Sequence, residues 1–130
     1  MRMDGKMEDE GSLTGRIIAA AIEVHREIGP GLLESAYEEC FCRELASRGI
    51  RYERQRELPI VHKGFDTGFR YRVDLVVEGS VIVELKSVDA VIKVHEAQIL
   101  SYMRMSGIDV GLPLNFNVDV LKKGIKRFVL

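Results

Sequence analysis

The chain has 130 residues, of which 46% are hydrophobic and 30% charged, and its formal net charge is −1. This length and composition favour one globular domain. The net charge argues against a protein coated in basic residues for nucleic-acid binding. There is no apolar run of 18 or more residues, so no membrane-spanning helix is expected.

The N-terminal stretch MRMDGKMEDEGS is polar and acidic. We interpret residues 1–11 as a flexible tail and expect residues 12–130 to form a single domain. The stretch lacks the apolar segment of a secretory signal, so we expect a cytoplasmic protein.

Two helices are expected first. Apolar residues at helical spacing predict a helix from Leu13 to Ile28, with Ser12 as its N-cap and the break at residues 29–31. A second helix is expected from Leu32 to Arg48, with Gly49 just past its end. Cys40 and Cys42 fall in this helix and lack the spacing of a zinc or iron–sulfur motif, so we interpret them as reduced structural thiols.

From Ile50 onward the period changes to that of strands. We expect one or two strands over residues 50–64, broken near Pro59. Pro113 suits an edge strand or a bulge better than a central position. The remaining expected elements are strands at 69–77 and 80–88, a helix at 93–107, and strands at 109–116 and 124–130. The predicted order is α-α-β-β-β-β-α-β-β, an α/β fold with a mixed β-sheet flanked by helices.

Basic residues are concentrated in two regions. Residues 43–72 and the C-terminal stretch LKKGIKRFVL contain most of the clustered lysines and arginines. They can form a local basic surface, or a solvated face of mixed charge, and charge alone favours the second interpretation.

The stretch RVDLVVEGSVIVELKS, residues 72–87, reads as a β-hairpin. A three-residue loop over residues 78–80 pairs apolar residues with apolar residues on both faces, whereas a two-residue loop mixes polar with apolar. The predicted pairs are Val77 with Val81, Val76 with Ile82, Leu75 with Val83 and Val73 with Leu85.

This register places Asp74 opposite Glu84 on one face of the hairpin. At ~5 Å and an effective dielectric constant of ~20, two like charges repel by roughly 3 kcal/mol. One solution is a divalent cation, since Mg²⁺ prefers carboxylate and water ligands. The other is a salt-bridge ladder in which Lys86 or Arg72 neutralises the acids, and the pattern alone leaves both open.

Four motifs carry a resemblance to a known family. Asp74 followed by the stretch ELK at 84–86 resembles the motif of the PD-(D/E)xK nuclease superfamily, with Val73 in place of the proline that names it. The stretch GLLESAY at 31–37 is similar to the signature of the small prokaryotic GxxExxY proteins, a branch of that superfamily. Gln98 and Tyr102 resemble the QxxxY motif of RecB-like nucleases. The resemblance covers residues 13–130 and implies a restriction-endonuclease-like core.

The resemblance also implies site residues and a cofactor. It implies Mg²⁺ or Mn²⁺ as the cofactor, which would polarise the scissile phosphate and activate a water. Lys86 would orient that water or stabilise charge on the phosphorus. The implied catalytic residues are Asp74, Glu84, Lys86 and Gln98, the implied metal ligands are Asp74, Glu84, the Leu85 backbone carbonyl and Glu34, and the accessory candidates are His95 and Tyr102.

Several of these residues have structural alternatives. Glu34 can be a first-turn helix acid that the helix dipole favours. Tyr102 can be a core aromatic, and His95 can be a water-exposed residue at a helix N-terminus. His25 and His62 lack a motif, and we interpret them as structural.

We therefore expect a metal-dependent nuclease that hydrolyses phosphodiester bonds of nucleic acid, DNA in preference to RNA. A homodimer would extend its basic groove. The alternative is a catalytically silent module that keeps the nuclease fold for nucleic-acid or protein binding, because fold does not fix function.

Overall fold

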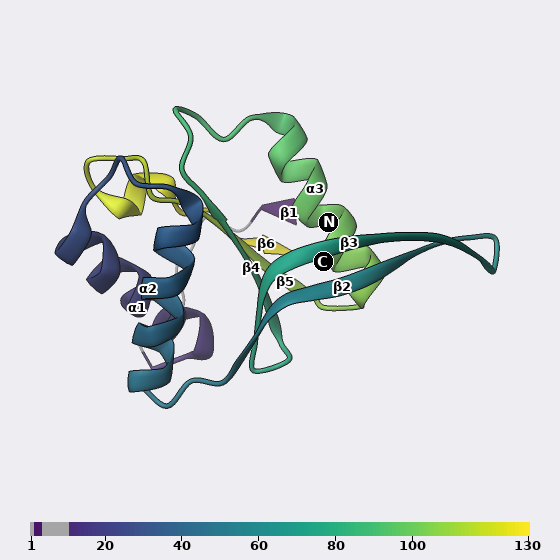
Figure 1. Cartoon of the computed structure of the whole chain (residues 1–130), viewed down its shortest axis with the longest axis horizontal. Coiled ribbons are helices and arrows are strands. Elements are labelled where there is room, and N and C mark those ends of the chain that lie inside the picture. The colour runs from purple at the N-terminus through teal and green to yellow at the C-terminus, as the bar shows by residue number, and fades with distance from the viewer. Residues whose placement is uncertain (1, 4–10) are drawn as a thin grey trace.

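The computed structural model describes residues 2–3 and 11–130. Two helices precede the long strands, and a third helix lies between two strands of the sheet (Figure 1). The elements are β1 (Arg2–Met3), α1 (Leu13–Ile28), α2 (Glu34–Ser47), β2 (Tyr52–His62), β3 (Phe65–Val77), β4 (Val81–Lys86), α3 (Lys93–Ser106), β5 (Val110–Asn115), the 3₁₀ helix η1 (Leu121–Gly124) and β6 (Phe128–Val129).

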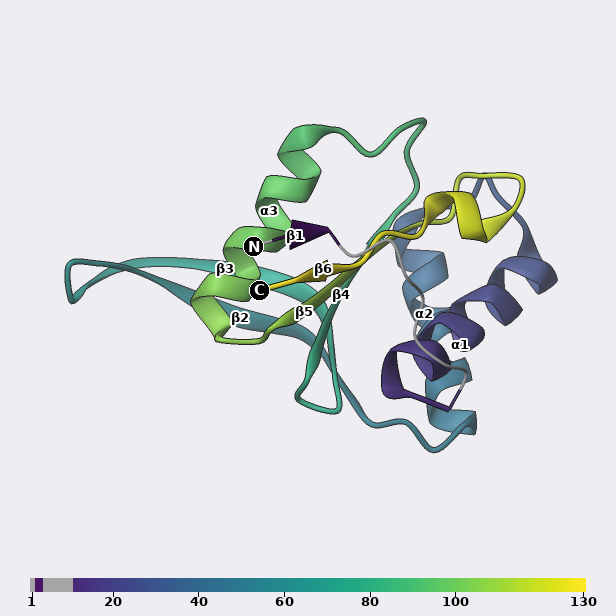
Figure 2. The same ribbon diagram turned by 180° about the vertical axis from the view of Figure 1, so that it is seen from behind.

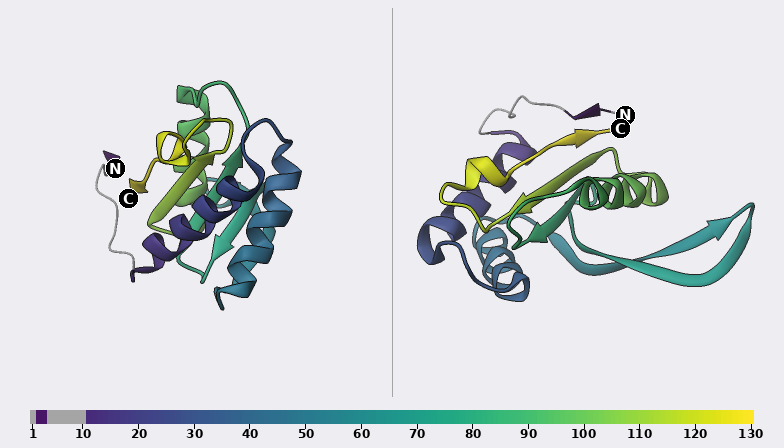
Figure 3. Two further views of the ribbon diagram at one scale, coloured as in Figure 1. Left: turned by 90° about the vertical axis from the view of Figure 1, so that its left-hand side faces the viewer. Right: turned by 90° about the horizontal axis from the view of Figure 1, so that it is seen from above.

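The strands of the described residues form one mixed sheet in the order β1-β6-β5-β4-β3-β2, and among these strands only β4 and β5 are parallel. Helix α3 makes the crossover between these two parallel strands. Helices α1 and α2 cover one face and α3 the other, as the opposite views show (Figures 2 and 3). Each interface has its own buried cluster: one joins α1 and α2 to the sheet, and the other lies under α3. The predicted α/β fold class is confirmed.

The helices follow their sequence signals closely. Ser12 caps α1, and its hydroxyl accepts the Gly15 N–H at 3.0 Å. Helix α2 begins at Glu34, two residues later than expected, because Leu33 is extended and takes the N-cap position. Gly107 ends α3 in the left-handed conformation, with φ of +74°, which a residue without a Cβ adopts at little cost.

Of the one or two strands expected over residues 50–64, one forms, and the interruption expected near Pro59 is a shift of register that does not end the strand. Residues 52–62 form one strand, whose pairing with β3 shifts register between Pro59 and Val61. Because β2 is the edge of the sheet, the missing N–H of Pro59 costs no ladder hydrogen bond. Between α2 and α3 the described residues therefore form one strand fewer than predicted, and β1 and η1 were not predicted.

Pro113 lies on the interior strand β5, contrary to expectation. Its carbonyl accepts the Lys126 N–H at 3.3 Å, so its backbone polar groups face the β6 side. The regular β5–β6 ladder ends two residues earlier, at Gly111 and Phe128. A proline is tolerated there because no ladder donor is required.

The β3–β4 hairpin has the predicted three-residue loop. The observed pairs are Leu75 with Val83, Val76 with Ile82 and Val77 with Val81, as predicted. The ladder ends at Leu75, so the predicted pairing of Val73 with Leu85 is wrong. Val73 packs in the cluster under α3, whereas Leu85 packs under α1 and α2.

The change of face coincides with an irregularity in β2. Gln55 has φ of +52°, and no ladder pair joins it to Asp74, although pairs form on both sides, at Arg54 with Leu75 and at Arg56 with Val73. A residue in the left-handed region interrupts the alternation of a strand. The irregularity lies directly beside Asp74.

The predicted tail, residues 1–11, falls mainly on residues 1 and 4–10, which lie outside the described residues. Arg2–Met3 pairs antiparallel with β6. Of the helices that the structure describes, none is long and apolar enough to cross a membrane.

Candidate active site

Two carboxyl groups meet where β3 and β4 separate. Asp74 on β3 is half-buried, and Glu84 on β4 is only 6% exposed. Asp74 Oδ2 accepts the backbone N–H of Leu85 at 2.8 Å, and a hydrogen bond joins the carboxyls of Asp74 and Glu84. The predicted meeting of the two acids therefore occurs, although the regular ladder ends one residue before it.

Glu84 has a strongly perturbed carboxyl. Burial, the hydrogen bond with Asp74 and the charge of Asp74 raise the pKa of Glu84 to about 10, and the charge of Lys86 lowers it in part. Glu84 Oε1 is buried and has no hydrogen-bond partner among the described residues. Among the described residues, the two acids therefore have no ion-pair partner, and one buried oxygen of Glu84 has no hydrogen-bond donor.

The salt-bridge ladder considered from the sequence does not form. In residues 2–3 and 11–130, neither Lys86 nor Arg72 makes an ion pair with Asp74 or Glu84. Arg72 instead pairs with Glu57 at 3.5 Å, and Lys86 is half-buried at the end of β4. Lys86 influences Glu84 only through its charge.

Tyr102 of α3 forms a wall of this site. It is 4% exposed, and burial together with the charges of Glu84 and Asp74 raises its pKa to about 12. Its ring lies 6.0 Å from that of Tyr71 on β3, at a tilted angle. Tyr102 is therefore both a core aromatic, as the structural alternative held, and a neighbour of the acid pair.

The other two predicted residues of α3 lie nearer its N-terminus. Gln98 is exposed, one turn before Tyr102, and its side chain makes no hydrogen bond with any described residue. His95 is half-buried, and its Nδ1 accepts the Ile92 N–H at 3.1 Å. His95 thus caps the helix, since this N–H has no partner within the helix.

Glu34 does not join the acid pair. It is exposed, and its Oε2 accepts the N–H of Ser87, the residue after Lys86, at 3.1 Å. Among the described residues, no group of three or more His, Cys, Asp or Glu side chains is placed to hold a metal ion. Glu34 therefore anchors the carboxyl end of β4, and the predicted ligand set is only partly assembled.

A family model for the PD-(D/E)XK nuclease superfamily matches residues 11–128. The chain belongs to this superfamily. No curated protein and no solved structure matches the chain. Asp74 and Glu84-Leu85-Lys86, which the sequence analysis compared with the superfamily motif, lie together on β3 and β4.

Within this superfamily fold, the segment that follows the Glu-x-Lys strand is firmly held. The Ser87 hydroxyl donates to the Leu32 carbonyl at 2.6 Å. Asn115, at 3% exposure, accepts the Val88 N–H at 3.1 Å and donates to the Val88 carbonyl at 2.9 Å. An open pocket of about 390 Å³ lies at this end of β4, and its lining residues are Leu32, Leu33, Glu34, Ser35 and Ser87.

Tyr37, the last residue of the GLLESAY stretch, stabilises the α1–α2 turn. Its hydroxyl donates to the Gly29 carbonyl at 2.5 Å and accepts the Leu32 N–H at 3.2 Å, while its ring stacks on Phe116 at 4.5 Å. Gly31 has φ of +92°, which favours glycine at this turn. Tyr37 therefore positions the turn beside Glu34 and does not reach the acid pair as a site residue.

Sequence reasoning missed a second polar layer behind Asp74. Gln55 Nε2 donates to Glu38 Oε1 at 2.7 Å and lies 3.5 Å from Asp74 Oδ1. Arg54 holds the other oxygen of Glu38 through two nitrogens, at 3.1 and 2.9 Å. The available signal was the spacing of Glu38, which lies four residues after Glu34 on the same helix face.

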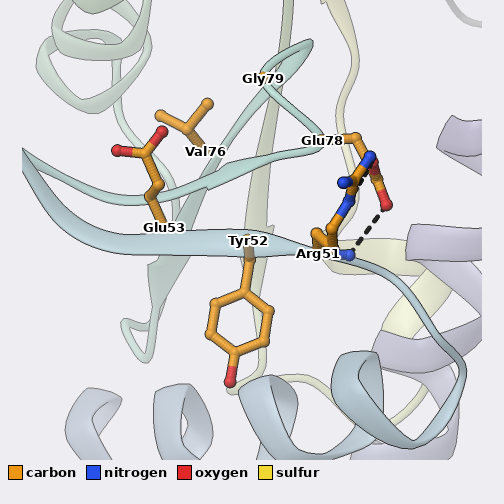
Figure 4. A pocket seen from close by; sticks show the side chains of 6 residues that line it. All are labelled: Arg51, Tyr52, Glu53, Val76, Glu78 and Gly79. Atoms are coloured by element: carbon orange, nitrogen blue, oxygen red, sulfur yellow. Dashed lines mark hydrogen bonds and ion pairs between the residues drawn. The ribbon is translucent and has the colours of Figure 1, made fainter.

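A separate pocket of about 200 Å³ lies at the β3–β4 turn, at the opposite end of β4 from Lys86 (Figure 4). Arg51 and Glu78 point toward one another there, and the Arg51 N–H donates to Glu78 Oε2 at 2.8 Å. None of the predicted site residues lines this pocket. It therefore plays no part in the candidate active site.

Proposed function

We propose that this protein is a metal-dependent nuclease that hydrolyses phosphodiester bonds of nucleic acid, with DNA preferred over RNA. The observation that carries the proposal is the Asp74–Glu84 pair, with its raised Glu84 pKa and its unpartnered buried oxygen. Strongly perturbed carboxyls beside a specific charged partner are typical of functional sites. We also propose that the chain belongs to the GxxExxY branch and acts in the cytoplasm.

The donor set fits Mg²⁺ or Mn²⁺. Asp74 and Glu84 supply carboxylate oxygens, and a cation between them would remove the cost of their like charges. Leu85 directs its N–H to Asp74, and its carbonyl faces the same edge of the strand, where it would be the third protein ligand. Water completes the shell, because Glu34 is engaged with Ser87.

Each side chain then has a defined task. A bound divalent ion supplies Lewis-acid chemistry at the phosphate and lowers the pKa of water. Lys86 stabilises the charge that develops on the phosphoryl oxygens. Gln98, exposed on α3, contacts the nucleic-acid backbone, and Tyr102 closes the buried side of the site.

The direct test is a cleavage assay on single-stranded and duplex DNA and on RNA. Cleavage is expected with Mg²⁺ or Mn²⁺, is lost with EDTA, and falls to background in Asp74→Ala. Equal cutting by wild type and Asp74→Ala would show contamination and refute the proposal.

Gln55 is expected to act as a positioning residue for Asp74. Gln55→Ala removes the amide that bridges Glu38 and Asp74, so we expect about 10-fold slower cleavage with an altered metal affinity. Gln55→Gly adds a control, because it removes the same amide and relaxes the backbone at φ of +52°. If both variants cleave like wild type, Gln55 has no positioning role.

A second candidate is the catalytically silent module that binds nucleic acid or protein. The observation that favours it is that Glu34 lies outside the acid pair, which leaves two carboxylates for a metal. Calorimetric titration with Mn²⁺, with and without DNA, separates the two candidates. Metal binding that leads to cleavage supports the nuclease, whereas salt-sensitive DNA binding without any metal supports the silent module.

A further inference from the structure

The distal part of the β2–β3 hairpin extends beyond the rest of the domain (Figures 1 and 3). Strand β4 pairs with β3 only at residues 75–77, and β2 is the sheet edge, so residues 56–72 form a two-stranded ribbon, which we name the arm. At a rise of ~3.3 Å per residue, β3 from Phe65 to Arg72 extends about 25 Å. The arm thus presents most of its side chains to solvent.

The arm exposes large aromatic side chains. Phe65 is 69% exposed, Phe69 73% and Tyr71 51%. Along Phe69-Arg70-Tyr71-Arg72, aromatic and arginine residues alternate, so the two aromatic rings share one face and the two arginines the other. Aromatic rings gathered on a protruding element indicate a binding surface.

The aromatic face leads directly into the candidate active site. Tyr71 pairs with Leu58 across the ribbon and lies against Tyr102, which borders the Asp74–Glu84 pair. Arg56 lies two residues from Leu58 and therefore shares this face, between Phe69 and the acids. A ligand lying along Phe69 and Tyr71 would reach the acids without leaving the surface.

Residues 52–72, which include the arm, carry a net positive charge, unlike the chain as a whole. Residues 52–72 contain five basic and three acidic side chains, in a chain of net charge −1. These are Arg54, Arg56, Lys63, Arg70 and Arg72, and Glu53, Glu57 and Asp66. Arg56 pairs only with Glu53 among the described residues, at 4.0 Å and in contact with solvent, and such pairs contribute little, so Arg56 can exchange this partner for phosphate.

We propose that the arm binds a single-stranded stretch of nucleic acid, with bases stacked on Phe69 and Tyr71 and a phosphate held by Arg56 on the same face. Stacking on exposed aromatic side chains combined with cationic contacts is the general mode of single-strand binding. A paired duplex would leave these rings without bases to stack on. This inference extends the proposed nuclease function. It rests on that function for the expectation that the bound strand runs from the arm to Asp74.

The test is fluorescence anisotropy of a labelled 20-nucleotide oligothymidine in EDTA, where no cleavage occurs. Phe69→Ala is expected to weaken binding about 10-fold and Arg56→Ala about 3-fold, with the Arg56 effect reduced at high salt. Phe69→Tyr is expected to bind within 3-fold of wild type, because it keeps a stacking ring. Val120→Ala, at another exposed apolar residue, is the matched control and is expected to bind like wild type.

Three results would overturn the inference. One is equal binding by Phe69→Ala and Val120→Ala. Another is that wild type binds a 20-base-pair duplex more tightly than the single strand and that Phe69→Ala weakens the binding of both by the same factor. The third is a wild-type dimer in sedimentation velocity that Phe69→Ala dissociates, which would make the arm an interface between two copies.

The outcomes for the arm and for the nuclease separate cleanly. If single-strand binding depends on Phe69 but no nucleic acid is cleaved with Mg²⁺ or Mn²⁺, the nuclease proposal is refuted and the binding role of the arm is supported. If the protein cleaves nucleic acid with metal but Phe69→Ala binds the single strand like wild type, the binding role of the arm is refuted and the nuclease proposal is supported. Phe69 suits this purpose because it is exposed and its loss leaves the core packing intact.

Discussion

Glu84→Gln is expected to stabilise the metal-free protein and to abolish its metal-dependent activity. The raised pKa of Glu84 means that the folded protein keeps a proton that the unfolded chain releases. Wild-type stability therefore decreases as pH rises from about 4.5 to about 10, the interval between the unfolded and folded pKa values. Glutamine does not titrate, so the advantage of the variant grows across this range.

Urea unfolding in EDTA at several pH values measures the effect. At pH 8.5 the variant is expected to be more stable by about 2–4 kcal/mol, since each pKa unit corresponds to about 1.4 kcal/mol and relaxation around a buried acid reduces the total. Adding Mg²⁺ is expected to stabilise wild type and not the variant. A variant less stable than wild type at every pH would contradict the raised pKa.

Glu38→Gln is the matched control for a buried carboxyl in the same region. Glu38 accepts hydrogen bonds from Arg54 and Gln55, so its neutralisation weakens an existing ion pair. The free energy of unfolding is expected to fall by about 1 kcal/mol, whereas Glu84→Gln is expected to raise it. The two variants distinguish the cost of an unpaired buried carboxylate at Glu84 from any general effect of replacing a buried acid.

Lys86→Ala is expected to lose cleavage while keeping metal binding. Lys86 borders the acid pair and carries no competing ion pair among the described residues, and in the proposed mechanism it stabilises transition-state charge. Removing one such group costs roughly 100- to 1,000-fold in kcat. Single-turnover cleavage measures this loss, and Mn²⁺ titration should give a Kd at or below that of wild type.

Two comparisons complete the Lys86 test. Lys86→Arg keeps the positive charge in a different geometry and is expected to recover only part of the rate. Lys122→Ala, at an exposed lysine on η1, is expected to cleave like wild type. If Lys86→Ala cleaves at the wild-type rate, the lysine serves only the electrostatics of the fold.

Much of the fold follows from local patterns in the sequence. The β3–β4 register was predictable because Leu75, Val76 and Val77 have only one consistent set of apolar partners across a short loop. The meeting of Asp74 and Glu84 follows from the same register. Ser12 and Gly49 mark helix ends because their capping chemistry is local.

The parts that were missed depend on contacts between distant segments. The left-handed Gln55 beside Asp74 is held by Glu38 from another element, and no strand periodicity reveals it. Glu34 was expected at the metal, but the N–H of Ser87 takes its carboxylate, and that contact depends on where α2 lies relative to β4. The continuation of β2 through Pro59 depends on its place at the sheet edge.

The attachment of residues 87 and 88 has a thermodynamic consequence for ligand binding. Glu34, the Leu32 carbonyl and Asn115 already fix the backbone that follows Lys86. Ordering one free residue costs roughly 1–2 kcal/mol of conformational entropy, and here folding has already met that cost. A ligand arriving at the end of β4 therefore meets a preorganised backbone, and its affinity is not reduced by the ordering of this segment.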